Sequence, residues 1–265
     1  MIGRSVALAV VLAVVIAVLL ASACGAGTAT TADNELVVFA AASLTEPLTE
    51  AADAYADGRP GLTVRLSFDS SAALRTQIEN GAPADVFLAA DATNPARLVD
   101  AGLSDGPALP FARNALAIIA PATGTRVTTA ADLGRDGIAI IAAGEEVPIT
   151  SYADEVIRRL AALPGYPGDL AARYARNVVS REDNVKAVVA KIELGEADAA
   201  IVYRTDALAA HGVRTIALPA EVDVVATYAG VVVGSPGSAE ARRFFEWLGG
   251  PRGREILGAA GFLPP

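Results

Sequence analysis

The chain has 265 residues, of which 53% are hydrophobic and only 5% aromatic, so small aliphatic side chains must fill a sizeable core. Its formal net charge is −9, and no block of lysine or arginine occurs anywhere along it. A nucleic-acid-binding protein needs a concentrated basic face to displace counterions from phosphates. The composition therefore argues against that class, and we expect no nucleic-acid partner.

Cysteine and histidine occur once each, as Cys24 and His211. A single cysteine rules out an intramolecular disulfide and a cysteine-based metal cluster. His211 precedes a glycine at a predicted helix end, where it caps the helix or faces solvent. The sequence thus offers no histidine-dependent catalytic triad and no zinc site, and we expect no cofactor, no bound metal cation and no enzyme activity.

The N-terminus has the three-part layout of a secretory signal, which places the rest of the chain outside the cytoplasm. A basic start ending at Arg4 is followed by the apolar run Val6–Ala21, and Ser22 and Ala23 are small. Cys24 follows directly and resembles the lipidated cysteine of a bacterial lipobox, although Ala21 stands where leucine is usual. We expect residues 1–23 to be a signal peptide and residues 24–35 a flexible tether. An uncleaved anchor or an ordinary signal peptide is the alternative.

From Leu36 onward the pattern alternates between apolar strands and amphipathic helices. The predicted strands cover 36–41, 62–68, 85–90, 114–120, 137–142, 177–180, 199–203 and 227–233. The predicted helices cover 44–57, 71–80, 95–101, 129–133, 151–163, 184–194, 205–210 and one long final segment, 238–257. Strands that alternate with helices predict an α/β protein with mostly parallel sheets flanked by helices.

The strand–helix rhythm restarts near Phe111–Asn114, and a second junction near Ala226–Tyr228 returns the chain to its first part. Two crossings of this kind predict two lobes joined by a hinge. Residues 36–112 and 227–265 would form one lobe and residues 113–226 the other. A cleft between them would be the natural place for a ligand.

Ser43 stands where the first strand ends and the first helix begins, after three alanines (40–42) and before Leu44. A hydroxyl at this point has two interpretations. It can cap the helix in a capping box with Glu46, or it can join the free helix N–H groups in binding an anion.

The same arrangement recurs at four further places where a strand or loop passes into a helix. These are Ser71 after Ser70, the loop around Ile149 before the helix beginning at Ser151, the helix start at Val185, and Tyr203 at the end of its strand. In open parallel sheets ligands bind beyond the carboxyl ends of the strands. Hydroxyls and free amides at such places predict a shared ligand site.

Three segments give a specific resemblance: "VFAAASL" (38–44), "GAPADVFLAAD" (81–91) and "IVYRTDA" (201–207). In this order and at these separations they resemble periplasmic molybdate-binding proteins, the ModA-type receptors of ABC transporters, from about Leu36 to Phe262. The resemblance implies a two-lobed periplasmic-binding-protein fold of type II. It also implies a monomer that captures molybdate, and tungstate, and delivers the oxyanion to a membrane permease.

In that family one deprotonated tetrahedral oxyanion is held by neutral donors alone. Carried over to this chain, the resemblance implies the hydroxyls of Ser43, Ser71 and Tyr203 and the backbone amides of Ile149 and Val185. The family loop commonly reads Val-Pro-Ala-Gly, whereas this chain has Val-Pro-Ile-Thr at 147–150. Thr150 is therefore a possible additional contact.

Asp69 precedes the serine pair, and a carboxylate aimed into the site would repel a dianion. We expect it to point away or to accept a helical N–H. A cage without acceptors would reject phosphate, which keeps a proton near neutral pH.

Other solutes remain alternatives on the same fold. They are sulfate, iron, and an amino acid bound through Arg75 and Asp69. Nucleophilic catalysis by Ser43 or Ser71 would need a base that the sequence does not provide.

Overall fold

The computed structural model describes residues 35–234 and 237–265. Leu36–Pro265 is one compact unit. The predicted signal peptide (1–23), the predicted lipidation site Cys24 and nearly all of the tether lie outside the described residues. Within the described ranges, no helix combines the length and the apolar character needed to cross a membrane.

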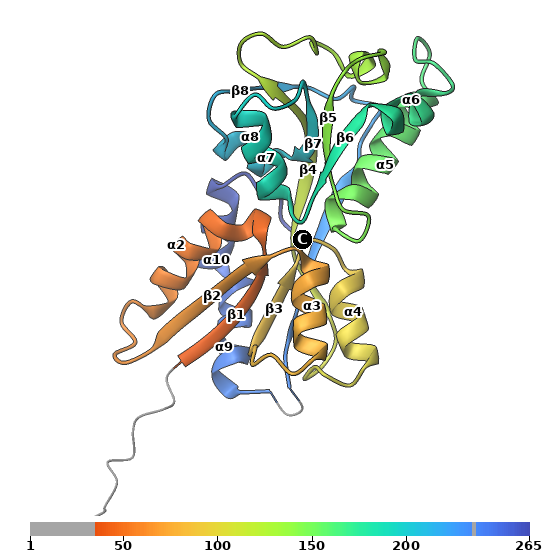
Figure 1. The fold of residues 1–265 in the computed structure, drawn as a ribbon. Coiled ribbons are helices and arrows are strands. Elements are labelled where there is room, and N and C mark those ends of the chain that lie inside the picture. The colour runs from red at the N-terminus through yellow and green to blue at the C-terminus, as the bar shows by residue number, and fades with distance from the viewer. Residues whose placement is uncertain (1–34, 235–236) are drawn as a thin grey trace, which may run out of the picture. The chain divides into compact units, whose positions relative to one another are not determined.

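Strands and helices alternate through Leu36–Pro265, which confirms the α/β class (Figure 1). The strands are β1 (Glu35–Ala41), β2 (Thr63–Asp69), β3 (Val86–Ala89), β4 (Leu109–Pro121), β5 (Ile140–Ala143), β6 (Val178–Glu182), β7 (Ala200–Tyr203), β8 (Val213–Ile216) and β9 (Val225–Val232). The helices are α2 (Thr45–Ala56), α3 (Ser71–Glu79), α4 (Thr93–Asp100), α5 (Pro148–Ala161), α6 (Leu170–Asn177), α7 (Val185–Glu193), α8 (Arg204–Ala209), α9 (Ala239–Leu248) and α10 (Pro251–Ala259). Two short 3₁₀ helices are η1 (Ala42–Leu44) and η2 (Ala130–Gly134).

The described strands form a seven-stranded sheet in the order β2-β1-β3-β9-β4-β7, with β8 beside β4, and a separate pair β5-β6. β1 runs parallel to β3, and β5 runs parallel to β6. β9 is antiparallel to β3 and β4, and β4 is also antiparallel to β7 and β8. The sheets are therefore mixed, where the sequence predicted mostly parallel ones.

The long strands β4 and β9 are the reason for the mixed pairing. Leu109–Ala115 of β4 pairs with β9, whereas Leu116–Pro121 pairs with β7 and β8. Figure 1 accordingly shows β4 passing from the group around β1–β3, α3 and α4 to the group around β5–β8, α5 and α7. Alternating strands and helices specify parallel pairing only within βαβ units. The pairs of β4 and β9 join strands that lie far apart in the sequence.

Small aliphatic residues fill the core, as the composition predicts. The alternate residues of β1 face opposite ways: Leu36, Val38 and Ala40 belong to the main core cluster, and Val37 and Phe39 to a second one. A strand that is buried on both faces is an unbroken apolar run. Such burial explains why the sequence of β1 shows no polar–apolar alternation.

Four parts of the structure differ from the sequence prediction. The final helix is two helices, α9 and α10, because Gly249, Gly250 and Pro251 interrupt it. The sequence analysis missed α6 and the short strand β8. The helix predicted from Ser151 begins at Pro148, so Ile149 and Thr150 lie in its first turn.

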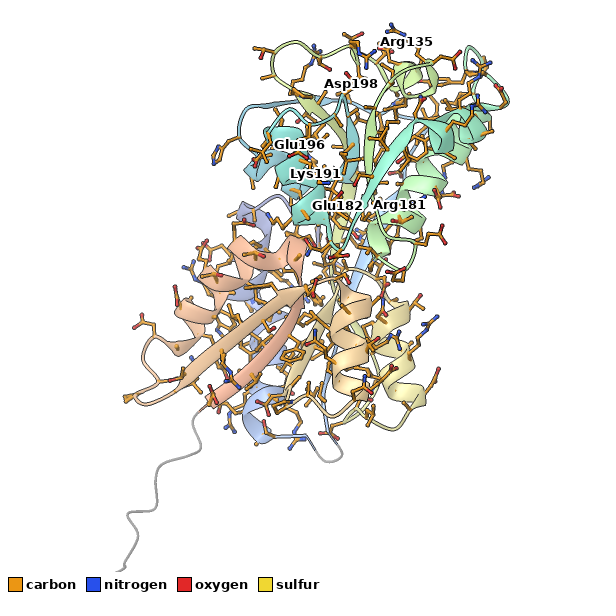
Figure 2. All side chains as sticks on the ribbon, viewed as in Figure 1. Arg135, Arg181, Glu182, Lys191, Glu196 and Asp198 are labelled. Carbon is orange, nitrogen blue, oxygen red and sulfur yellow. The ribbon has the colours of Figure 1, made fainter. Side chains whose placement is uncertain are left out.

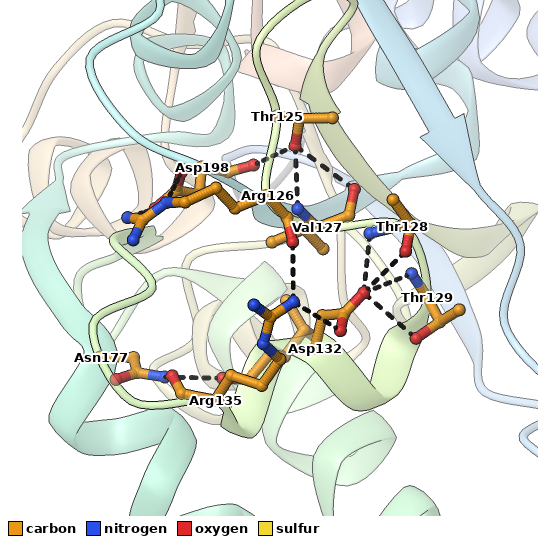
Figure 3. Close-up of polar contacts among 10 residues, drawn as sticks. Thr125, Arg126, Val127, Thr128, Thr129, Asp132, Arg135, Asn177 and Asp198 are labelled. Carbon is orange, nitrogen blue, oxygen red and sulfur yellow. Dashed lines mark hydrogen bonds and ion pairs between the residues drawn. The ribbon is translucent and has the colours of Figure 1, made fainter.

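A polar network around Asp132 and Asp198 holds the segment that leads into β5 (Figure 3). Asp132 Oδ2 accepts the backbone N–H groups of Thr128 (2.8 Å) and Thr129 (2.9 Å). Partial burial raises the pKa of Asp132, but these bonds and Arg135 outweigh it and hold the pKa well below its usual range. Asp198 Oδ1 accepts from Arg126 Nε (3.0 Å), and its Oδ2 accepts from the Ala139 N–H (2.8 Å). We interpret the network as structural.

Candidate functional site

One small cavity is lined by residues from six different places where a strand or loop passes into the next element. Its volume is about 10 Å³, the scale at which an enclosed space admits one water-sized particle. The lining residues are Ala41, Ala42, Ser43, Asp69, Ser70, Ser71, Ala90, Val147, Pro148, Ile149, Asn184, Val185 and Tyr203. All five residues of the ligand set implied by the sequence are among them.

Ser43 lies in η1, directly after β1, and is 3% exposed. Its Oγ is 2.8 Å from the phenol oxygen of Tyr228 in β9. The alternative interpretation of Ser43 as a helix cap is wrong. The residue at the N-cap of α2 is Leu44, and Glu46 pairs with Lys186 Nζ at 2.7 Å instead of completing a capping box.

Ser70 and Ser71 have different hydrogen bonds at the start of α3. Ser70 is the N-cap, and its Oγ accepts the N–H of Ala73 at 3.2 Å. Ser71 is 1% exposed, and its Oγ accepts the N–H of Ala90 at 3.0 Å. Because a backbone N–H can only donate, the hydroxyl proton of Ser71 remains available to a ligand.

Two helix N-termini contribute backbone amides. Ile149 is the second residue of α5, after Pro148, and Val185 is the first residue of α7. Their N–H groups belong to the first turn, where an α-helix offers no internal acceptor, and neither finds an acceptor among the described residues. The helix dipole adds a partial positive charge at the same ends.

The α7 end is fixed by its surroundings. The Asn184 side chain caps it by accepting the N–H of Ala187 at 3.1 Å. Lys191 of α7 pairs with Glu182 at the end of β6 at 2.8 Å, and Figure 2 labels both. These contacts hold the loop before Val185 between β6 and α7.

Tyr203 ends β7 and is 1% exposed. Its phenol oxygen has no hydrogen-bond partner among the described residues. Burial raises the pKa of Tyr203 well above its usual value, so the phenol is a neutral donor at neutral pH. A buried hydroxyl without a partner is unusual and indicates a missing acceptor.

The cavity lining contains one charged side chain, Asp69, and, within the described residues, no arginine, lysine or histidine. Asp69 Oδ1 accepts the N–H of Ser70 at 2.7 Å and the side-chain amide of Asn184 at 3.3 Å. The expectation that Asp69 accepts an N–H at the helix start is confirmed. The carboxylate nevertheless remains part of the lining.

Thr150 does not line this cavity. Its hydroxyl lies 3.1 Å from the carbonyl oxygen of Ala143 and 2.7 Å from that of Gly144, to which it donates. The Thr150 hydroxyl therefore already donates to backbone carbonyl groups at and just after the end of β5. The geometry does not support the predicted contact of Thr150 with a ligand. Of the two residues that depart from the family loop, Ile149 lines the cavity and Thr150 does not.

The sequence analysis did not assign Asn184 and Tyr228 to the site. Asn184 could have been inferred as the cap before Val185, because asparagine is a favoured N-cap residue. No local pattern identifies Tyr228, which meets Ser43 across 185 positions of sequence. Elsewhere in the described residues, no group of three or more histidine, cysteine, aspartate or glutamate side chains is arranged to hold a metal ion.

The mixed sheets flanked by helices, with the cavity at helix N-termini, define the class as the α/β periplasmic-binding-protein fold. The family model for bacterial extracellular solute-binding proteins matches residues 36–263. The chain belongs to this family.

Particular relatives are similar over nearly the whole chain. "Molybdate-binding protein ModA" of Mycobacterium tuberculosis is 35% identical over 233 residues, which are 87% of this chain and 85% of that protein. The protein of the same name from Escherichia coli is 31% identical over 246 residues, or 89% and 92% of the two chains. The solved structure of the Azotobacter vinelandii periplasmic molybdate-binding protein has a TM-score of 0.72 and 26% identity, and the match covers 87% of this chain and 99% of that one.

Proposed function

We propose that this chain captures molybdate, and also tungstate, outside the cytoplasm and delivers it to an ABC permease. The ligand donors in this proposal are the hydroxyls of Ser43, Ser71 and Tyr203 and the amides of Ile149 and Val185. Each charge-assisted hydrogen bond to the anion would contribute about 1.5–3 kcal/mol. The molybdate-binding relatives support the choice of ligand.

The observation that carries the proposal is the composition of one cavity. Five groups that can donate, and carry no charge, come together from widely separated parts of the sequence, and no lysine or arginine joins them in the described lining. A protein with net charge −9 gains nothing from long-range attraction of an anion. Short hydrogen bonds in a small enclosed space are therefore the natural source of affinity.

The same groups explain selectivity. Molybdate, tungstate and sulfate are fully deprotonated near neutral pH, so donors alone satisfy them. Phosphate keeps a proton, and Asp69 is the one carboxylate in the described lining. Its Oδ1 accepts from Ser70 and Asn184, so rejection of phosphate requires that Oδ2 point away from the ion. Among the deprotonated ions, sulfate is the smallest and would leave its hydrogen bonds too long in a cage fitted to molybdate.

Two alternatives lose support. An amino-acid receptor would use Arg75, but Arg75 is outside the cavity lining and pairs with Glu79 at 2.5 Å and Asn94 at 2.9 Å. Catalysis by Ser43 or Ser71 would need a base, and His211 is exposed on the surface. We propose binding without catalysis and without a resident cofactor.

We further propose two lobes, residues 36–112 with 227–265 and residues 113–226, that close on the ion by a hinge motion. The two-part pairing of β4 supports this division. We also propose that the chain is a monomer held at the membrane through lipidated Cys24. This anchor rests on the sequence pattern alone.

Thermal denaturation with added oxyanions tests the proposal. Molybdate and tungstate should raise the melting temperature strongly, because stabilisation grows as RT ln(1 + [L]/Kd), while phosphate and amino acids should leave it nearly unchanged. No shift at millimolar molybdate would contradict the proposal.

The two adjacent serines provide a matched control. Ser71→Ala should weaken molybdate binding about 10- to 100-fold. Ser70→Ala should lower unfolding stability by about 1 kcal/mol, because the α3 cap is lost. Ser70 also lines the cavity, but its Oγ is engaged by the Ala73 N–H, so this variant should weaken binding less than Ser71→Ala does. Equal loss of affinity in both variants would show that the serine donors are wrongly assigned.

A further inference from the structure

Tyr228 forms a buried hydrogen bond with the serine that we propose as a ligand donor. The Tyr228 phenol oxygen and Ser43 Oγ are 2.8 Å apart, and the two residues are 0% and 3% exposed. Tyr228 itself is not part of the cavity lining. Either hydroxyl can supply the proton of this bond, and the choice decides what Ser43 presents to a ligand.

The surroundings favour Tyr228 as the donor. A phenol is far more acidic than an aliphatic hydroxyl, so it is the stronger donor of the pair. The amide nitrogen Nδ2 of Asn114 lies 3.5 Å from the phenol oxygen and donates to Thr205 Oγ1 at 2.9 Å. A side-chain NH₂ group can only donate, so its hydrogens turn the phenol proton away from Asn114 and toward Ser43.

The phenol keeps this role over the working pH range. Burial raises the pKa of Tyr228 well above its usual value, and the carboxylate of Asp206 raises it further. Tyr228 is therefore protonated whenever the protein is folded near neutral pH. Ser43 then accepts one proton and has its own left for another acceptor.

Ser71 is also a hydrogen-bond acceptor whose own proton is left for another partner. Its Oγ accepts the backbone N–H of Ala90, not a phenol. In both cases another group of the protein donates to the serine oxygen. The serine proton is then free to point into the cavity. The two serines are thus held as donors before any ligand arrives.

We infer that Tyr228 is a positioning residue, which donates to Ser43 Oγ and thereby directs the Ser43 proton at the bound oxyanion. This inference rests on the proposed function and extends it to a residue that does not touch the ligand. It also gives a reason for burying a phenol behind the site. Without this donor, no other hydrogen bond among the described residues would fix the direction of the Ser43 proton.

The test is a double-mutant cycle of Tyr228→Phe and Ser43→Ala, with molybdate affinity measured by calorimetric titration of the purified protein. Phenylalanine keeps the edge contacts of the ring with Phe111, Tyr203 and Phe262. Tyr228→Phe alone should weaken binding about tenfold. In the Ser43→Ala background the same substitution should change the affinity less than twofold, because Tyr228 acts through Ser43.

Tyr55→Phe is the matched control. Tyr55 is also fully buried, and its phenol donates to Glu240 at 2.6 Å, but it lies outside the cavity lining. Its substitution should lower the melting temperature, leave molybdate affinity unchanged and show no coupling to Ser43→Ala. A general effect of losing a buried phenol would weaken binding in this variant too, and that result would overturn the inference.

The remaining outcomes are distinct. If the wild-type protein binds molybdate and Tyr228→Phe binds equally tightly, or if the two substitutions are additive, the inference is wrong and the proposed function stands. If the wild type binds no molybdate, both fail. If Tyr228→Phe alone does not fold, Ser43→Ala is compared with the double variant, in which both polar partners are removed together. Equal affinities support the inference, and weaker binding by the double variant overturns it.

Discussion

At the scale of single residues, the unpaired phenol of Tyr203 is the clearest sign of a ligand. Buried hydroxyl groups in proteins almost always have a partner, because an unmade hydrogen bond costs about 1–3 kcal/mol. Tyr203 has none among the described residues, although it lines the same cavity as Ser43 and Ser71. A bound oxyanion would supply the acceptor.

This arrangement predicts opposite effects of Tyr203→Phe on stability and on binding. The unliganded variant should be at least as stable as the wild type, because an unpaired buried hydroxyl is removed. Its molybdate affinity should fall about tenfold or more, because one donor is lost. Melting curves with and without molybdate measure both effects, and a variant that is less stable without ligand but equally stabilised by it would contradict the assignment.

The structure brings the predicted site residues together, but several of their local contacts differ from those that the sequence suggested. Ser43, Ser71, Ile149, Val185 and Tyr203 all line one cavity, as the resemblance implied. The Ser-x-x-Glu pattern at Ser43 suggested a capping box, but the Ser43 hydroxyl forms its hydrogen bond with the phenol of Tyr228 in β9. Thr150 likewise bonds to nearby carbonyl groups. Tertiary partners decide where a side chain points, and a local pattern does not contain them.

At the scale of elements, short helices present their N-termini to the cavity. The start of α8 differs from the others because it carries a buried carboxylate, Asp206, which is 1% exposed. Burial raises the pKa of Asp206 to about 6, although Lys186 opposes the shift. Lys186 Nζ is 3.4 Å from Asp206 Oδ1 and closer to Glu46, at 2.7 Å.

The raised pKa predicts how stability changes with pH. Because the pKa of Asp206 is higher in the folded than in the unfolded state, the folded protein binds more protons between the two values. The stability contributed by this group is present below the unfolded value and lost as the pH rises through about 6.

Asp206→Asn removes that dependence. Relative to this variant, the wild type should lose about 1.4 kcal/mol of unfolding free energy between pH 5 and pH 8, because the rest of the total of about 3 kcal/mol is lost below pH 5. Urea unfolding of both proteins at the two pH values measures the difference. A difference in unfolding free energy that does not change with pH would contradict the assignment of the raised pKa to Asp206.

The sequence pattern predicted which elements occur better than it predicted where they begin and end. The alternation of strands and helices predicted most elements, because β1 and β3 are unbroken apolar runs and α5 has a clear apolar face. The final helix was predicted as continuous across Gly249–Pro251, although proline removes a backbone donor and favours a new helix start there. β8 was missed because only four residues, two of them exposed, make up the strand.

At the scale of the whole molecule, the proposed lobes should close when the ion binds. β4 pairs with β9 over its first half and with β7 and β8 over its second, so it would serve as part of the hinge. Molybdate should reduce the radius of gyration measured by small-angle X-ray scattering. The same addition should have no effect on the Ser43→Ala, Ser71→Ala double variant, and an unchanged wild type would contradict closure by a hinge.

Net charge also acts at this scale, because the acidic molecule repels the anion that we propose it binds. The account therefore depends on neutral donors that work only at short range. The resemblance to molybdate-binding proteins implied such donors, and the sequence could not predict the size of the cavity. Cage dimensions depend on side-chain packing across β1, α3, α5 and α7, which no sequence pattern encodes.

A crystal structure with bound molybdate, in which anomalous scattering locates the metal, is the most direct test. The account predicts one molybdenum atom in the cavity, with its oxygens within hydrogen-bond distance of the Ser43, Ser71 and Tyr203 hydroxyls and the Ile149 and Val185 amides. Molybdenum at another place, or bound mainly through arginine or lysine, would contradict it.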